Sequence, residues 1–175
     1  GITIFFFAMI AVFYSNNKFK YWLISGALIS LLLSWGKNFP ILTDVFIDYF
    51  PFYNKFRAVS SIQIILEFCF PVLAAIGVYT IANEKKEFWK SILKVSLIIS
   101  GILFLLILSK NFISFSGLND PYFKSVYGDL LFEKILDERK SIFVYDIVRA
   151  IIFSLVLALI SILFKIDKIS LNKMM

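Results

Sequence analysis

Five long apolar runs constrain this chain more than any motif does. They occupy residues 2–14, 21–35, 60–82, 91–109 and 147–164. With 60% hydrophobic and 17% charged residues, and a mean hydropathy of +0.86, the chain has more apolar surface than a soluble domain of 175 residues buries. In lipid, backbone groups must be hydrogen-bonded internally, so we expect each run to be a membrane-crossing helix. The sequence predicts an all-α, polytopic transmembrane helix bundle that forms one domain over residues 1–175.

The charges of the connections predict how the bundle is oriented. The short connections, 15–20, 83–94 and 165–175, carry nine Lys. The long connections, 36–59 and 110–146, carry eight Lys or Arg in about twice as many residues, together with eight of the twelve acids. Basic connections stay in the cytoplasm, so we expect the two long loops to lie outside. The net charge of +6 follows from this topology, and we expect the lipid bilayer, not nucleic acid, as the partner.

Several classes of chemistry lack their residues. The chain has no His and one Cys, Cys69, so a His/Cys zinc site and a His-dependent nucleophilic site cannot be built. The seven Gly are scattered and form no phosphate-binding loop. We therefore predict no metal site and see no cofactor motif.

The first long loop is too apolar for a solvated linker. Pro40 and Pro51 can begin and end a helix, and between them apolar residues recur at helical spacing: Leu42, Val45, Phe46 and Tyr49. This pattern predicts a short amphipathic helix in the membrane interface.

Three interpretations of this loop stay open. The loop can be an aromatic anchor at the lipid headgroups. It can instead be a pocket for a phosphorylated ligand, in which cations hold phosphate and polar or aromatic neighbours complete the site: Lys37, Tyr53, Asn54, Lys55 and Arg57. In the third interpretation, Asp44 and Asp48, four residues apart, form a metal-binding or general-acid pair.

The second long loop carries a second helix signal and an acid–base pair. Asp120 as a cap and Pro121 at the first position predict a helix running to about residue 140. Asp146 and Arg149 stand three apart where the last apolar run begins, and can pair in the interface. Alternatively, Arg139 and Arg149 join the first loop's cations around one anion.

A polar stripe enters the third apolar run. Glu67 lies about ten residues beyond the first loop's last cation, with Gln63 one turn above it and Pro71 one turn below. An ionisable group at membrane depth faces a bundle interior or water. We expect Glu67 to be either a relay or ligand contact, or a protonated acid bonded to a neighbouring helix.

Two stretches together resemble the YfhO-like family of bacterial polytopic membrane proteins. The first comprises LSWGKNFP (33–40) and FPFYNKFRA (50–58), and the second is DERKS (137–141) followed by Asp146 and Arg149. The sequence departs from the family pattern at Val59, where Pro is expected, and at Glu67, where Gln is usual. The family's members are longer, so the resemblance implies a middle-to-C-terminal piece of such a protein. The short first run, which no basic region precedes, also predicts a chain that begins inside a longer protein.

The resemblance implies a fold similar to the GT-C glycosyltransferases of the bacterial inner membrane. It implies use of a polyprenyl-phosphate-linked sugar as donor at the outer leaflet, to modify an envelope glycan or lipid. The catalytic carboxylate of such enzymes would lie outside this chain, so no catalytic residue is assigned here. The alternatives are a transporter or flippase for a lipid-linked precursor that uses Glu67, and a non-catalytic scaffold subunit with envelope protein partners.

Overall fold

The computed structural model describes residues 1–36, 40–50, 59–117 and 119–166. Over these residues the chain is helical and contains no strand. The α-helices, in order, are α1 (Ile2–Tyr14), α2 (Phe19–Ser34), α3 (Pro40–Tyr49), α4 (Gln63–Asn83), α5 (Trp89–Leu108), α6 (Asp120–Tyr127) and α7 (Asp129–Lys165). Short 3-10 turns precede α4 at Val59–Ile62, precede α5 at Lys86–Phe88 and follow α5 at Ser109–Asn111.

The five apolar runs correspond to five of these helices. Three of them, α4, α5 with its final turn, and α7, are long and apolar enough to cross a membrane. The other two, α1 and α2, are shorter apolar helices of 13 and 16 residues. The all-helical fold is therefore confirmed, as is the presence of helices able to span a bilayer.

The last apolar run belongs to a longer helix than the sequence predicted. We expected one helix to about residue 140 and a separate span from residue 147. The structure instead ends α6 at Tyr127 and begins a continuous helix of 37 residues at Asp129. Gly128, with φ of 78°, supplies the left-handed conformation that stops α6. No Gly or Pro occurs within α7, so nothing interrupts its hydrogen bonding over about 55 Å.

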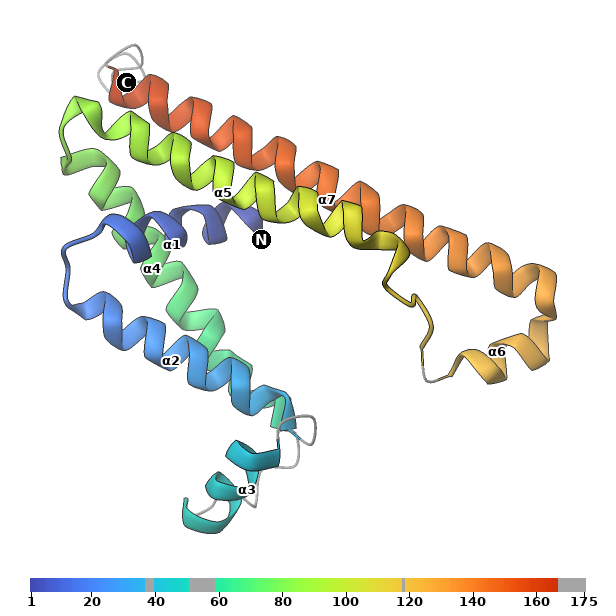
Figure 1. The fold of residues 1–175 in the computed structure, drawn as a ribbon. Helices are drawn as coiled ribbons and strands as arrows, with labels where there is room; N and C mark the ends of the chain where they lie inside the picture. The colour runs from blue at the N-terminus through green and yellow to red at the C-terminus, as the bar shows by residue number, and fades with distance from the viewer. Residues whose placement is uncertain (37–39, 51–58, 118, 167–175) are drawn as a thin grey trace, which may run out of the picture.

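The helices form two pairs that diverge from one end of the molecule (Figure 1). In one pair α2 lies beside α4, and in the other α5 runs antiparallel to α7. Helix α1 lies between the pairs and contacts α4 most extensively, and also α5 and α7. The short helices α3 and α6 lie at the far ends of the two pairs.

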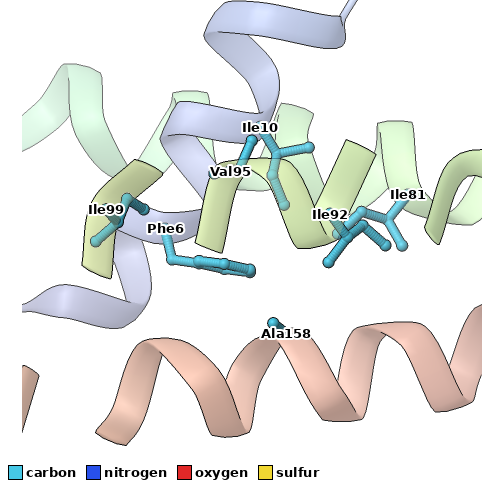
Figure 2. Close-up of a cluster of buried hydrophobic side chains, with 7 residues drawn as sticks. All are labelled: Phe6, Ile10, Ile81, Ile92, Val95, Ile99 and Ala158. Carbon is cyan, nitrogen blue, oxygen red and sulfur yellow. The ribbon is translucent and has the colours of Figure 1, made fainter. Parts of the chain in front are cut away.

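Two hydrophobic clusters meet on α1. One joins α1 to α4, α5 and α7, as Figure 2 shows, through Phe6, Ile10, Ile81, Ile92, Val95, Ile99 and Ala158. The other joins α1 to α2 and α4 through Ala8, Ala11, Leu23, Ala27, Cys69 and Leu73. Lipid is as apolar as these side chains, so close packing holds the clusters together more than removal from water does. Helix α1 connects the two pairs because both of its faces are packed.

The closest approach between helices occurs where α1 crosses α4. A Cβ atom on Gly77 would collide with the main-chain oxygen of Phe7 and would also meet the backbone nitrogen of Ala11. Small residues allow such backbone-to-backbone contact between membrane helices. Gly77 therefore determines how closely α1 can approach α4.

Two buried lysines cap the C-terminal ends of helices. The Nζ of Lys20 donates to the carbonyl oxygens of Val12 at 2.9 Å and Ser15 at 2.6 Å, at the end of α1. The Nζ of Lys165 donates to the carbonyl of Ile81 at 2.7 Å, in the last turn of α4. The last carbonyls of a helix lack intrahelical donors and carry partial negative charge, so a cation is favourable there. No local sequence pattern indicates this capping role for either lysine, because the carbonyl groups that they bond belong to other helices.

Candidate functional site

The predicted binding residues divide into two groups. Five of them lie outside the described residues: Lys37, Tyr53, Asn54, Lys55 and Arg57. The others are carried by two helices, with Gln63 and Glu67 on α4 and Arg139, Asp146 and Arg149 on α7. The described part of the candidate site is therefore built on rigid helices, which fix where each side chain begins.

Asp146 and Arg149 line a common cavity of about 530 Å³. Ala150 and Phe153 continue the wall along α7, and residues 1–3 at the start of α1 form the opposite wall. The spacing of Asp146, Arg149 and Phe153 by three and four residues places all three on one face of α7. Asp146 and Arg149, which the sequence predicted can pair, thus both line a cavity that α1 borders on its other side.

Asp146 and Arg149 do not form an ion pair with each other or with any other described residue. Both side chains are exposed. The guanidinium of Arg149 lies over the ring of Phe153, 5.7 Å from its centroid. A cation over an aromatic face keeps its N–H edge available, so Arg149 retains the donors that an anion would need.

Arg139 has different partners. Its guanidinium makes two parallel bonds to the carboxylate of Asp120, each of 2.9 Å, and its Nη1 also donates to the carbonyl of Phe115 at 2.8 Å. The backbone N–H of Gly117 donates to the same carboxylate at 2.6 Å. Asp120 is 6% exposed, so this bidentate pair is largely shielded from water. The pair fastens the start of α6 and the segment before it to α7.

The hydrogen bonds between Asp120 and Arg139 shift the pKa of each group in the direction that favours its charged form. The hydrogen bonds from Arg139 and then from Gly117 hold the pKa of the Asp120 carboxyl below its ordinary value. The hydrogen bond to Asp120 in turn raises the pKa of the Arg139 guanidinium. The sequence predicts Asp120 as the cap of α6, and this prediction is wrong. The residue at the cap position is instead Asn119, and the Asp120 side chain bonds Arg139.

The two arginines of α7 therefore stand in different surroundings. They are ten residues apart, which is about 15 Å along the helix axis. Arg149 lines the cavity beside α1, whereas Arg139 lines an apolar groove of about 480 Å³ with Leu131, Ile135 and Ile142. The structure brings Asp146 and Arg149 together and joins Arg139 to Asp120.

Glu67 lines a second cavity, on the other side of the start of α1. This cavity has a volume of about 320 Å³ and is lined mainly by α1 and α4 side chains, among them Phe5, Phe70 and Pro71. Glu67 lies in the second turn of α4, about 6 Å along the axis from Gln63, the first residue of that helix. Both Gln63 and Glu67 are exposed.

The predicted helix of the first long loop is present as α3. Asp44 and Asp48 are exposed on it, and Thr43 is buried and donates from its Oγ1 to the carbonyl of Gly36 at 3.1 Å. Within the described ranges no three His, Cys, Asp or Glu side chains are grouped as metal ligands.

Comparisons of the chain with protein-family models, with curated proteins and with solved structures found no match. The candidate site therefore rests on the geometry of the chain itself. In chemical terms, it offers a guanidinium with open donors, a carboxylate one turn away and an apolar cavity beside them. This combination suits an anion attached to an apolar body.

Proposed function

We propose that the chain is the membrane part of a glycosyltransferase-like protein that uses a polyprenyl-phosphate-linked sugar. In this proposal the five apolar helices cross the bacterial inner membrane, and α3 and α6 lie at its outer interface. The two long loops are extracytoplasmic, and the sugar is transferred to an envelope glycan or lipid. The basic short connections and the resemblance to the YfhO-like family support this arrangement.

The observation that carries the proposal is the state of Arg149. An arginine inside or beside a membrane span normally pairs with an acid or with backbone carbonyls. Among the described residues Arg149 has neither, although Asp146 is only one turn away, and it faces a cavity of about 530 Å³. A phosphate bound there would satisfy the guanidinium through two oxygens.

The other residues take roles that follow from their chemistry. Phe153 and Ala150, deeper along α7, supply an apolar wall for the first isoprene units. Asp146 can accept hydrogen bonds from sugar hydroxyls beside the phosphate. Lys37, Lys55 and Arg57, with Tyr53 and Asn54, are the first loop's contribution to the same ligand. We assign Arg139 to the folding of the outer segment because its donors already bond Asp120 and Phe115.

The test is lipid mass spectrometry on the gently purified full-length protein. We expect a polyprenyl phosphate or its sugar conjugate to co-purify with the wild type and to be lost from Arg149→Gln. Lys124→Gln is the matched control, since it removes one exposed cation on α6 and should retain the lipid. Arg57→Ala tests the first loop in the same way.

Two results would overturn this assignment. Equal lipid in Arg149→Gln and wild type would remove Arg149 from the site. No polyprenyl phosphate in a folded wild-type sample would favour a non-catalytic scaffold subunit.

A flippase for a lipid-linked precursor is the second candidate, and the position of Glu67 beside a cavity favours it. Lipid flipping in proteoliposomes that follows a proton gradient, and that stops in Glu67→Gln, would support this candidate over the transferase.

A further inference from the structure

The cavity between α1 and α4 combines one carboxylate with an otherwise apolar lining. Among the described residues that line it, Glu67 has the only ionisable side chain, and the lining is completed by Gly1, Ile4, Phe5, Leu66, Phe70 and Pro71. In the described part of the chain Glu67 forms no ion pair. A carboxylate in apolar surroundings requires a counter-ion or a proton. Among the described side chains that line the cavity there is one anionic group and no cation, so these side chains favour a positively charged ligand.

Pro71 adds a second acceptor at the same place. In an α-helix the N–H of residue 71 would bond the carbonyl oxygen of residue 67, and proline has no N–H to donate. The main-chain oxygen of Glu67 thus loses its helical partner, and both Glu67 and Pro71 line the cavity. One residue therefore presents a carboxylate and a carbonyl that lacks its usual helical N–H donor, and these two acceptors together suit a donor with several N–H groups.

Two aromatic rings stand beside these acceptors. The rings of Phe5 and Phe70 are stacked, with centroids 6.1 Å apart and planes 14° from parallel. The face of an aromatic ring attracts an ammonium group, and the effect is larger away from water. With about 320 Å³, the cavity holds a headgroup fragment and leaves acyl chains in the surrounding lipid.

We propose that the cavity between α1 and α4 binds the primary ammonium headgroup of a membrane lipid, with Glu67 as its counter-ion. The position of Glu67 along α4 agrees with this occupant. Glu67 lies about 6 Å along the axis from the first residue of α4, and lipid headgroups meet acyl chains near the end of a membrane-crossing helix. The carbonyl freed by Pro71 selects a primary ammonium over a trimethylammonium, which has no N–H. Both cavities border the start of α1, but their charged residues lie on different helices, Glu67 on α4 and Arg149 on α7, so each site can be tested by its own substitutions.

The experiment uses the full-length protein in lipid nanodiscs of mixed composition, with native mass spectrometry of the lipids that it retains. The probes are phosphatidylethanolamine, phosphatidylcholine and phosphatidylglycerol. We expect the wild type to prefer them in that order. Glu67→Gln should lower the preference for phosphatidylethanolamine over phosphatidylglycerol roughly tenfold, as the loss of a charge-assisted contact does.

Three further variants isolate the parts of the site. Pro71→Ala restores an N–H for the Glu67 carbonyl, and should reduce the preference for phosphatidylethanolamine over phosphatidylcholine. Phe70→Leu keeps the carboxylate and should weaken retention of phosphatidylethanolamine and phosphatidylcholine. This variant therefore tests the site even if Glu67→Gln does not fold. Glu133→Gln removes an exposed acid on α7 and should change nothing. Unchanged lipid preference in folded Glu67→Gln, or in Phe70→Leu where only that variant folds, would overturn the proposal, whatever the outcome at Arg149.

Discussion

At one end of the molecule the C-terminal ends of α1 and α4 receive Lys20 and Lys165, each with its Nζ on main-chain carbonyls. We call this the capped end. Near the start of α1, Arg149 and Glu67 line cavities and have no ion-pair partner among the described residues. We call this the cavity end. The two lysines of the capped end complete the hydrogen bonding of helix ends. Arg149 and Glu67 at the cavity end are instead available to a ligand of opposite charge.

The difference is one of bonding and not of charge type. Lys165 and Arg149 lie on the same helix, sixteen residues apart, and both are cations of a mostly apolar segment. Lys165 is 8% exposed and its ammonium is hydrogen-bonded, while Arg149 is exposed, lies over the Phe153 ring and forms no ion pair with a described residue. Burial and hydrogen bonding therefore distinguish charges that stabilise the fold from charges that can bind a ligand better than position in the sequence does.

The largest effect is expected from Gly77, which tests the packing that holds the capped end together. Gly77→Ala places a Cβ against the main-chain oxygen of Phe7, so α1 and α4 must separate. We expect a loss of about 2–3 kcal/mol in the free energy of unfolding, as overpacked sites show. Thermal unfolding in detergent measures it.

Gly101 is the matched control for that substitution. It lies on α5, and a Cβ there would meet nothing within 4 Å. Gly101→Ala should leave the protein as stable or raise its stability by up to about 1 kcal/mol. If both alanines behaved alike, the close approach of α1 to α4 would not limit stability.

The next effect concerns the capping lysines. Lys165→Met keeps the apolar stem and removes the ammonium that bonds Ile81, so the last turn of α4 loses its donor. We expect a loss of about 1–2 kcal/mol, typical of a hydrogen bond to a charged group at a helix end. Lys20→Met should act alike, and Lys18→Met, at an exposed position, should not. Normal stability of Lys165→Met would erase the distinction between the two ends.

The sequence predicted the apolar helices well because their signal is local. A run of residues able to cross lipid is visible without knowing its neighbours, so all five runs became helices. Contacts between distant segments had no such signal. Lys165 bonds a carbonyl 84 residues away, and Arg139 pairs with an acid 19 residues away. The sequence predicted a local role for Asp120 as a helix cap, because only the folded chain reveals its partner Arg139.

Gly128 shows the same limit at a single residue. The sequence predicted one helix through this position, because the apolar pattern continues on both sides of it. Its positive φ instead divides the segment into α6 and α7. The spacing of Asp146 and Arg149 predicted that they can pair, but in the structure they line one cavity and form no ion pair with each other.

A third prediction addresses the pair of Asp120 and Arg139, which behaves like the capped end although it lies in a long loop. Asp120→Asn removes the carboxylate charge, so α6 should detach locally while the apolar helices stay folded. Hydrogen exchange of residues 112–117 and 119–127 should rise. Lys124→Gln, which breaks an exposed ion pair of 3.1 Å to Asp129 in the same region, should have little effect.

The pH dependence of this pair follows from the direction of the shift. A carboxyl whose pKa is lowered in the folded state contributes stability above its unfolded pKa, and loses it as the pH falls through the folded pKa. Asp120 is such a carboxyl, so the wild-type segment should stay protected down to pH values below the ordinary range of Asp. Protection of wild type that is already lost near pH 6 would show that another group controls α6.

The smallest effect on stability is expected at Arg149. This variant tests most directly whether the cavity end differs from the capped end. Arg149→Gln removes only a contact with the Phe153 ring, which at an exposed site contributes about 0.5–1 kcal/mol. Unfolding of the unliganded variant should therefore resemble that of wild type. Addition of a polyprenyl phosphate should raise the unfolding temperature of wild type, because a ligand that binds only the folded state stabilises it, and should not affect Arg149→Gln. If Arg149→Gln unfolded as readily as Lys165→Met without ligand, Arg149 would be a structural cation, and the cavity end would not differ from the capped end.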